Sequence, residues 1–496
     1  MAEPQGDNQL KPPEMQHLDI EVTVAWLWMG WPVQKIPSGL PPICGGQQIW
    51  SKSLSSGPCM KKKKSKGGVT RLQFFVIVFI SSFAYYLVPS YLFPTISAIS
   101  IVCLIWKNSI TAQQIGSGLS GMGLGSFGID WSTVASFLGS PLATPGFAII
   151  NILAGFVLIM YVILPISYYR NASHAKRFPI SSPHTFDSNG QKYVTRILDP
   201  KTFSIDLAGY NAYSKLYLSV FFAFTYGISF ATLTAAISHQ PGLNVITQLI
   251  IGYVYPGKPL ENATFKTYGY ISMVQALTFL SDFKLGHYMK LVGTLVASSA
   301  YFGTAWWLLT SVENICQPDL LPEGSPWTCP GDDVFFNASV IWGVAGPPRM
   351  FARLGLYPEM NWFFLVGLLA SVPVWLLSLK YPNKKWIKLI NMPIIFGATG
   401  NMPPAKSVHL FMWGAVGLDF NFYVNRVYKN WWAKHTYVLS AALDAGVAFM
   451  GIIVFFALQT KGIYGVGWWG LEADDHYPLA SCSTAPGIVV DGCPTL

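Results

Sequence analysis

Long apolar runs alternate with short polar stretches over most of this chain. A helix needs roughly 20 predominantly apolar residues to cross a lipid bilayer. The runs that approach this length are 72–88, 91–106, 144–166, 215–238, 291–311, 360–379 and 436–459. The pattern predicts an all-α fold, a polytopic bundle of transmembrane helices.

Shorter apolar stretches are interrupted by Pro, Gly or Asn. They cover residues 243–255, 268–281, 386–398 and 405–418. Non-helical backbone is tolerated at membrane depth only where it is buried in protein or lines a watery cavity. We therefore expect broken helices and re-entrant segments within the bundle.

The polar and apolar stretches divide the chain into three parts. Residues 1–70 are polar, rich in Pro, Gly and Ser, and end in the basic cluster KKKKSK (61–66), which predicts a disordered cytoplasmic tail. Residues 71–460 form the predicted transmembrane domain, and residues 461–496 a second tail. Composition supports this division, because 52% of the residues are hydrophobic and only 11% charged, against roughly 25% charged in soluble domains.

We attribute the net charge of +9 to lysines and arginines that anchor loops on the cytoplasmic face of the membrane. The lipid bilayer is therefore an expected partner, and nucleic acid is not. Residues 380–388 and 426–434 are basic, which places them in the cytoplasm. Residues 313–333 hold five acidic residues and no Lys or Arg, which predicts an extracytoplasmic loop, and the acidic tail 461–496 is assigned to the same side.

Both of these acidic regions carry cysteine pairs. An extracytoplasmic location permits disulfides, for which the candidates are Cys316, Cys329, Cys482 and Cys493. The sequon at Asn337 is a candidate glycosylation site.

Motifs for nucleotide, metal or hydrolytic chemistry are weak or missing. The run GMGLGSFG matches GxGxxG at Gly123, Gly125 and Gly128, but it lies in a polar loop, without the strand and helix that dinucleotide binding requires. The chain has no Walker A, HExxH or GxSxG sequence, and its eight histidines are dispersed. We expect neither an enzyme nor an ATP-driven pump, with no cofactor and no metal site.

A polar break interrupts the apolar run at "IIGYVYPGKPLENATFKTYGY" (250–270). Pro lacks an amide donor and Gly permits turn geometry, so the helix ends there. The following piece carries Lys258 and Glu261 and can line a cavity, where exposed helix ends bind carboxylate or amino groups. An ordinary polar loop between two spans is an equally good interpretation.

Asp444 lies about two turns inside the last apolar run, next to small residues. An ionisable group at that depth is a functional candidate by default. A hydrogen-bonded Asp near the interface is the alternative.

Other candidates for the substrate and proton path lie at two more breaks. Lys284 and His287 share a helical face, Asp282 lies nearby, and His287 can exchange protons near neutral pH. An interfacial helix end explains them as well. The second break is the near repeat NMPII (391–395) and NMPPA (401–405), which includes Asn401. Its prolines interrupt helix hydrogen bonding and leave backbone carbonyls unpaired. A simple turn between two apolar stretches is the alternative.

At these residues the chain resembles the oligopeptide transporter family, in its fungal peptide-transport branch. The matching blocks include SPLATPGFAIINILAGFVL (140–158), FDSNGQKYVTRIL (186–198), GLNVITQLIIGYVYPGKP (242–259), NMPPA and YVLSAALDAGVAFMGIIVFFALQ (437–459), within residues 71–480. The resemblance implies a plasma-membrane symporter that imports tetra- and pentapeptides together with protons, with glutathione among the candidate substrates.

The chain departs from the family pattern at several points. The initial spans are missing, His239 joins Gln240 directly, and Lys290 runs into Leu291 where relatives carry a Pro-Pro-Arg stretch. These departures predict a truncated chain. The alternatives are a metal-chelate carrier of the yellow-stripe-like type and an inactive truncated paralogue or faulty gene model.

Overall fold

The computed structural model describes residues 69–193, 204–235, 243–273, 292–312, 314–315, 320, 329–352, 355–461, 463, 468–471, 477–490 and 492–494. Helices dominate this part of the chain. Its strands are two short antiparallel pairs, β1 (Ile99–Ser100) with β2 (Ser126–Phe127) and β3 (Thr185–Phe186) with β4 (Tyr217–Leu218). The predicted all-α transmembrane bundle is confirmed. Four helices of the described residues are long and apolar enough to cross a membrane: Arg71–Leu92, Gly146–Tyr169, Pro358–Lys380 and Lys429–Ala457.

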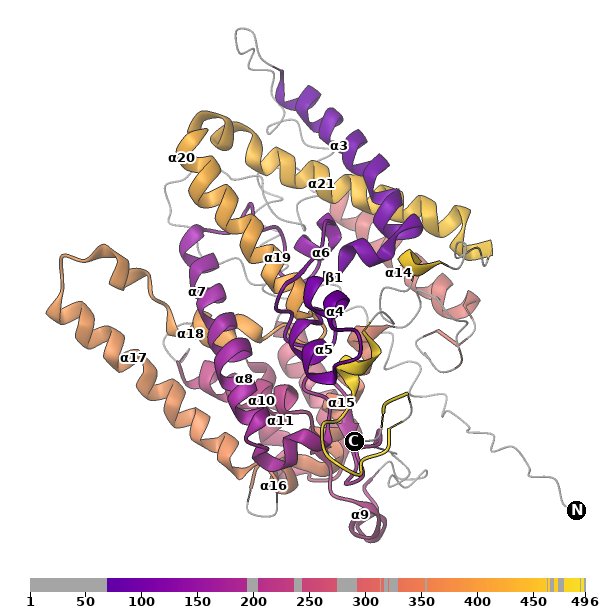
Figure 1. Ribbon diagram of the computed structural model, residues 1–496, viewed down its shortest axis with the longest axis vertical. Coiled ribbons are helices and arrows are strands. Elements are labelled where there is room, and N and C mark those ends of the chain that lie inside the picture. Colours follow the sequence, from indigo (N-terminus) through magenta and orange to yellow (C-terminus); the bar gives the residue numbers. More distant parts are fainter. Residues whose placement is uncertain are drawn as a thin grey trace, which may run out of the picture.

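The first and last of these helices, α3 (Arg71–Leu87, continued by η2, Val88–Leu92) and α21 (Lys429–Ala457), pack side by side (Figure 1). Phe74 near the start of α3 contacts His435 near the start of α21, and farther along the Ser82 hydroxyl donates to the Leu443 carbonyl at 3.0 Å. The two helices are therefore parallel. Arg71 at the start of α3 and Lys429 at the start of α21 therefore lie at the same end of the pair.

A glycine allows this close approach. A Cβ atom on Gly446 would lie 2.5 Å from the Cβ of Ser82 and 2.6 Å from the backbone nitrogen of Phe83. Close backbone packing through small residues is how membrane helices gain dispersion contacts when lipid removes the hydrophobic driving force.

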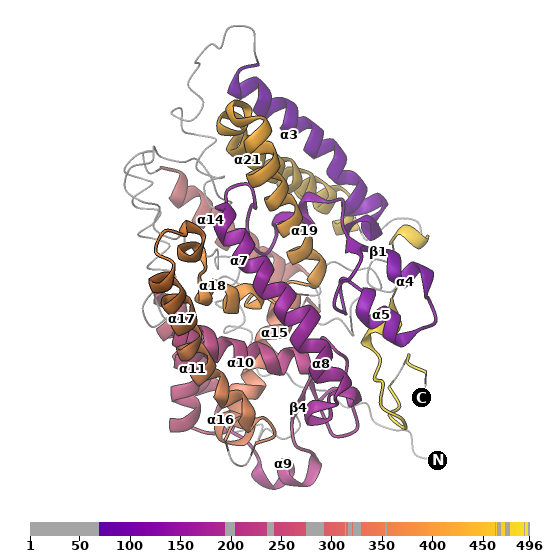
Figure 2. The ribbon, with the colours of Figure 1, turned by 60° about the vertical axis from the view of Figure 1, so that its left-hand side comes forward.

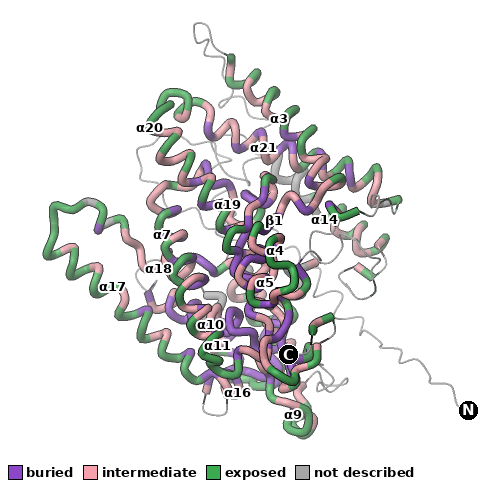
Figure 3. The backbone as a smooth tube through the Cα atoms, in the orientation of Figure 1, coloured by how far each residue is buried: buried purple, intermediate pink, exposed green. Residues whose placement is uncertain are grey.

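The centre of the molecule is built on α7 (Gly146–Val157) and α10 (Val220–Ala235). The helix of α7 continues through η4 (Leu158–Ile163) and α8 (Leu164–Tyr169). Alongside α10 runs α17 (Trp362–Lys380, preceded by η9, Pro358–Asn361), which forms one edge of the molecule and is exposed over most of its length (Figure 3). Side chains of α7, α8 and α10 form one buried cluster that includes Ile149, Phe156 and Phe221.

A re-entrant hairpin packs on α7. Its first arm is α18 (Met392–Phe396) with η11 (Gly397–Thr399), and its second arm is α19 (Ser407–Leu418) with η12 (Asp419–Val424). The side chain of Asn151 accepts from the backbone amide of Asn391, and Gly155, farther along α7, packs against Ala398, so α18 is parallel to α7. Gly414 packs against Leu153 and Gly417 against Ile149, so α19 is antiparallel to α7. The expected re-entrant segments 386–398 and 405–418 are thus the two arms, joined by a non-helical tip, residues 400–406 (Figure 2).

The break at residues 250–270 forms a second hairpin. The arms are α11 (Leu243–Val254) and α12 (Pro259–Lys266, continued by η6, Thr267–Ile271), which contact each other across the turn at 255–258. This hairpin packs against α15 (Pro330–Ser339), η8 (Val340–Ala345) and α16 (Gly346–Met350). Gly343 and Pro259 touch at the junction.

Two expectations about spans change. The predicted run 91–106 is not one helix: after Leu92 it divides into η3 (Pro94–Ser97), β1 and α4 (Ile101–Ile105), because Pro94 and the capping Ser100 start new elements. The polar loop expected around GMGLGSFG is flanked by two short helices, α5 (Ile110–Gly116) and α6 (Trp131–Ala135), on either side of the glycine-rich loop 117–125. Both are capped by side chains, Ser109 and Asp130, and neither is apolar enough to be recognised as a span.

The remaining helical elements complete the described part of the chain. They are η5 (Ala172–Arg177), α9 (Leu207–Tyr213), α14 (Val292–Ser311), η10 (Lys385–Leu389), α20 (Asn425–Val427), η13 (Gln459–Lys461), η14 (Trp469–Leu471) and η15 (Pro478–Ser481).

The contact between α3 and α21 yields a test of the fold. We expect Gly446→Leu to lower the stability of the purified protein by about 1–3 kcal/mol or more, because the new side chain must displace the α3 backbone. Thermal unfolding in detergent measures the change. Gly451→Ala on the same helix is the control, since its Cβ would meet only the Tyr86 ring, at 3.9 Å. Equal melting temperatures for both variants would contradict the packing.

Candidate substrate site and proton-linked carboxylate

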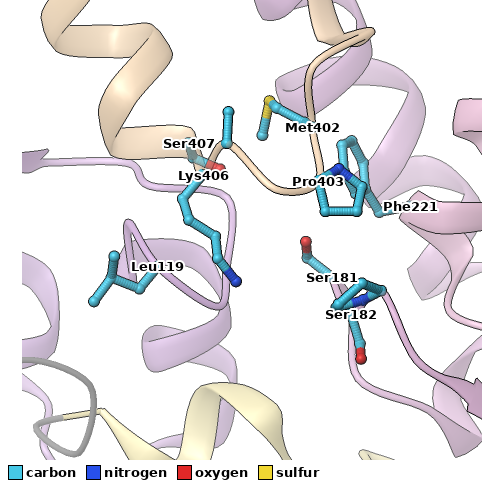
Figure 4. Close-up of a pocket in the computed structure, with 10 residues that line it drawn as sticks. Leu119, Ser181, Ser182, Phe221, Met402, Pro403, Lys406 and Ser407 are labelled. Carbon is cyan, nitrogen blue, oxygen red and sulfur yellow. The ribbon is translucent and has the colours of Figure 1, made fainter. Parts of the chain in front are cut away.

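A small cavity with both polar and apolar lining residues lies where three non-helical segments meet (Figure 4). Its volume of about 10 Å³ is close to the space that one water molecule requires. The lining residues come from the glycine-rich loop, from residues 181–183, from the start of α10 and from the tip of the α18–α19 hairpin: Leu119, Ser181, Ser182, Pro183, Phe221, Met402, Pro403, Ala405, Lys406 and Ser407. Of the broken segments expected to line a cavity, the stretch that ends in NMPPA (401–405) contributes to this wall, whereas residues 250–270 do not.

The hairpin tip is non-helical because of its prolines. Pro403 and Pro404 have no amide donor, and both of their preceding peptide bonds are cis. Helix α19 starts directly after them, at Ser407, whose hydroxyl donates to the Gly121 carbonyl at 2.8 Å. The Lys406 side chain extends toward the cavity in Figure 4.

The glycine-rich loop closes over the start of α19. The Val408 amide donates to the Gly118 carbonyl at 3.1 Å. A Cβ on Gly118 would lie 2.7 Å from the Cβ of Val408, and one on Gly123 would lie 2.7 Å from the Cβ of Ser407. Gly123 also has a φ of +77°, which other residues rarely adopt. Of the GxGxxG pattern, Gly123 is therefore explained by close packing of this loop on the N-terminus of α19, whereas Gly128 packs against Ser97.

Serines form the opposite wall of the cavity. The Ser219 hydroxyl caps α10 and donates to the Ser182 carbonyl at 2.7 Å, while the Ser182 amide donates back to it at 3.2 Å. In Figure 4 the Ser181 hydroxyl faces the hairpin tip across the cavity. Hydroxyl groups that line a cavity in an apolar bundle can bind water or the backbone of a solute.

Asp444 lies inside α21, away from this cavity, and is half-buried. Its carboxylate accepts a hydrogen bond from the Trp131 indole at 2.7 Å. One turn earlier on α21, the Ser440 hydroxyl bonds the Ser140 hydroxyl at 2.6 Å. Residues 131–140 thus run along α21 with a contact at each end.

The same segment reaches the hairpin. The Phe137 carbonyl accepts from the Asn401 side-chain amide at 3.2 Å, and the Gly139 carbonyl accepts from the Trp413 indole at 3.1 Å. Asn401, predicted from its NMP motif, therefore joins the hairpin tip to the segment that holds Asp444. This connection between a carboxylate and the cavity wall was not visible in the sequence, because segment 131–140 carries no unusual motif.

Lys258 and Glu261 do not line the cavity. They form an ion pair at 3.3 Å at the surface, where their side chains are 48% and 45% exposed. Exposed pairs of this kind contribute only about 0–1 kcal/mol. The structure does not place residues 250–270 in the wall of this cavity; the turn 255–258 is the exposed end of a packed hairpin.

The buried lysine of this hairpin is Lys266, which sequence reasoning passed over. It is 3% exposed, and its ammonium lies 4.5 Å from the centre of the Phe335 ring. Such a cation–π contact contributes about 2 kcal/mol when desolvated, whereas burying an ammonium costs several kcal/mol. The ring alone does not offset the burial of this charge.

The remaining predicted residues are placed as follows. Cys482 and Cys493 form a disulfide, and Cys329 is also disulfide-bonded. Asn337 is buried, and its side-chain oxygen accepts from the Thr185 amide at 3.2 Å, so a glycan there would have to displace this contact. Asp282, Lys284, His287 and Cys316 lie outside the described residues.

The C-terminal tail contacts α5, α8 and β1. The Gln114 side chain donates to the Cys482 carbonyl at 2.9 Å, and the Tyr168 hydroxyl bonds the Thr484 hydroxyl at 2.9 Å. The Ser100 amide donates to the Tyr477 hydroxyl at 3.0 Å. Burial raises the pKa of Tyr477, so this phenol stays neutral near neutral pH. The disulfide-linked tail thereby fixes α5, which leads into the glycine-rich loop.

Comparisons with known proteins agree with this architecture. The family model for OPT oligopeptide transporter proteins matches residues 52–241 and 238–458. Oligopeptide transporter 1 of Arabidopsis thaliana is 51% identical over 541 residues, covering 88% of this chain and 72% of the relative. Oligopeptide transporter 5 is 50% identical with the same coverage, and oligopeptide transporter 2 is 44% identical, covering 87% and 73%. No solved structure matches the chain.

The alignment contains segments of the relatives that this chain lacks, because 541 aligned positions correspond to only 88% of its 496 residues. The family match itself divides at residues 238–241, next to the junction of His239 and Gln240. On both sides of this division the match extends over most of the described helices. The chain belongs to the OPT family of oligopeptide transporter proteins.

Proposed function

We propose that this chain is a secondary carrier that imports small oligopeptides together with protons across the plasma membrane. The observation that carries the proposal is the polar junction of the α18–α19 tip with the glycine-rich loop, in a chain half identical to proteins named oligopeptide transporters. The names of the relatives describe transport rather than catalysis, which supports the expectation that the chain is not an enzyme. Tetra- and pentapeptides are the expected substrates, with glutathione as a further candidate.

The proposed substrate position is the cavity between Ser181 and the hairpin tip. A peptide needs donors and acceptors for its own amides, and the cavity wall offers hydroxyls, unwound backbone and the Lys406 ammonium. In its closed form the cavity holds about one water, so a peptide requires the tip to move away from residues 181–183. Such opening and closing of one segment against a fixed scaffold is the motion expected of an alternating-access carrier.

Asp444 is the proposed proton-linked group. Ionised, its carboxylate accepts the Trp131 indole hydrogen; protonated, it is a weaker acceptor and the hold on residues 131–140 loosens. Since Phe137 of this segment bonds Asn401, protonation is transmitted to the tip of the hairpin. This gives a physical route by which a proton and a peptide can affect each other's binding.

The relatives named above are proteins of Arabidopsis thaliana, so placement in the fungal branch of the family rests on sequence blocks alone. The proposed truncation rests on the missing alignment segments and on the junctions 239–240 and 290–291, both outside the described residues. Transcript reads across the two junctions test it: reads that supply extra coding sequence would identify an incomplete gene model.

Uptake of a labelled tetrapeptide tests the function in cells that lack their own peptide carriers. We expect accumulation above vector controls that rises as the external pH falls. Surface-expressed protein without any uptake would support the inactive paralogue instead. Uptake that does not respond to external pH would remove proton coupling from the proposal.

Asp444→Asn should abolish the acid stimulation of uptake, because asparagine keeps the size and the acceptor oxygen but cannot change its charge. Coupling energies between two sites typically correspond to about 5- to 150-fold in affinity, so we expect uptake at acidic pH to fall by roughly tenfold. Glu261→Gln, at an exposed carboxylate, is the control and should retain the pH response. A pH response that survives in Asp444→Asn would exclude Asp444 as the proton-linked group.

Ser181→Phe should block transport by filling the cavity, while Ser181→Ala, which removes one hydroxyl without filling the cavity, should lower uptake only about 2- to 10-fold. Overpacking costs about 1–3 kcal/mol, so the melting temperature of each variant is measured beside its uptake. Normal uptake by a folded Ser181→Phe variant would place the substrate elsewhere.

A further inference from the structure

The loop that follows α8 contains a sequon, Asn171-Ala-Ser173, which has the Asn-x-Ser pattern of N-linked glycosylation. All three of its residues are exposed. Two further sequons begin at Asn337 and Asn262, which are 5% and 2% exposed. A glycan is bulky and lies at the surface of a folded protein. Of the three sequons in the sequence, the one at Asn171 is therefore the one whose surroundings have room for a glycan.

The backbone conformation at Asn171 is compatible with this modification. Its φ is +57°, in the left-handed region, which asparagine tolerates better than most residues. Its side-chain oxygen accepts from the Lys176 amide at 3.0 Å. An N-linked glycan is attached to the side-chain nitrogen and leaves the oxygen as a carbonyl acceptor. Glycosylation therefore does not require the turn between Asn171 and Lys176 to open.

The helix that leads to Asn171 begins at the basic end of the bundle. A Cβ on Gly146, the first residue of α7, would lie 3.2 Å from the Phe422 ring of η12, which continues through α20 into the basic residues 426–434. Basic stretches of this kind mark the cytoplasmic side. The helix Gly146–Tyr169 has 24 residues and rises about 36 Å, whereas the hydrocarbon core is about 30 Å thick. Asn171 therefore lies beyond the opposite face of the bilayer.

The far end of this helix packs against the disulfide-linked tail. The Lys176 carbonyl accepts from the Thr484 amide at 3.0 Å and from the Ser483 hydroxyl at 2.9 Å. The preceding residue, Cys482, forms a disulfide with Cys493. Disulfides form and persist in oxidising compartments, which include the lumen of the endoplasmic reticulum. N-linked glycans are attached in the same compartment, so the tail and the sequon lie on the side where this chemistry takes place.

The charge of the loop favours the other side. Arg170, Lys176 and Arg177 flank the sequon, and the positive-inside rule taken alone would place them in the cytoplasm. The rule describes a statistical excess of basic residues, whereas a disulfide requires an oxidising environment. The contact of the loop with the disulfide-linked tail therefore decides its side.

We propose that Asn171 carries an N-linked glycan on the extracytoplasmic face of the membrane. The oligosaccharide comes from a lipid-linked pyrophosphate donor in the lumen. A bond forms between C1 of the first sugar and the Asn171 Nδ2, and the C1–O bond to the pyrophosphate breaks. The lipid pyrophosphate leaves with the electron pair of that bond, and the amide nitrogen gives up one proton to a base of the transferase. This inference goes beyond the proposed transport and does not depend on it.

The experiment compares the electrophoretic mobility of the full chain, expressed in yeast, before and after digestion with peptide N-glycosidase. We expect the wild type to show the shift of a single glycan. Asn171→Asp should lose the shift, because aspartate keeps the oxygen acceptor and tolerates a positive φ but has no amide nitrogen. Ser173→Gly is the second variant: it removes the hydroxyl that the sequon requires, and its φ of +50° suits glycine.

The two buried sequons provide the matched controls. Ser339→Ala and Thr264→Ala remove them without changing an asparagine, and both variants should retain the full shift. An unchanged mobility of the wild type after digestion would overturn the proposal, and so would a shift that persists in Asn171→Asp or in Ser173→Gly. Loss of the shift in Ser339→Ala or Thr264→Ala instead would assign the glycan to a buried sequon and would also overturn it. All of these outcomes are read without measuring transport, so they are independent of whether the chain carries peptides.

Discussion

The structure depends on one constraint, that no backbone amide or carbonyl can face hydrocarbon without a hydrogen-bond partner. Helices α3, α7 and α21 meet it along their own length. The tip of the α18–α19 hairpin and the glycine-rich loop cannot, and each supplies partners to the other: Gly118 and Gly121 accept from the first residues of α19. These two breaks therefore lie against each other in the interior of the bundle, whereas the turn 255–258 lies at the surface.

The contact between the glycine-rich loop and the start of α19 is possible because the two backbones approach closely. Glycines of the loop fit directly against Ser407 and Val408, where any side chain would clash. The same device joins α21 to α3 at Gly446. Because such contacts are close-packed, a small displacement on one side of the loop requires a displacement on the other. This behaviour is compatible with a transporter that alternates between discrete states.

Charged residues of the α11–α12 hairpin illustrate how position decides their meaning. Lys258 is solvated and already paired, so its charge has little structural weight. Lys266, eight residues later, is buried, and its ammonium lies 4.5 Å from the centre of the Phe335 ring. Asp444 is intermediate: it is half-buried and held by a single indole donor, so a change in its charge alters one specific contact, to Trp131.

Much of the fold could be predicted from the chain alone. Apolar run length identified the spanning helices around 72–88, 144–166, 360–379 and 436–459, because bilayer thickness sets that length independently of neighbours. Prolines identified the breaks at 391–405, and small residues around Asp444 indicated close helix packing. Helices α5 and α6 could not be found in this way, since their polar residues are satisfied by distant partners such as Cys482 and Asp444.

The identity of the candidate site residues was decided by tertiary structure. The sequence by itself determined that Asp444 lies at depth and that Asn401 lies at a break, because both follow from local pattern. It did not determine that segment 131–140 connects them, or that Lys266 rather than Lys258 is buried, because α12 presents charged residues on both of its faces. Which face turns inward is settled only when the hairpin packs against α15 and η8, which buries Lys266 and leaves Lys258 exposed.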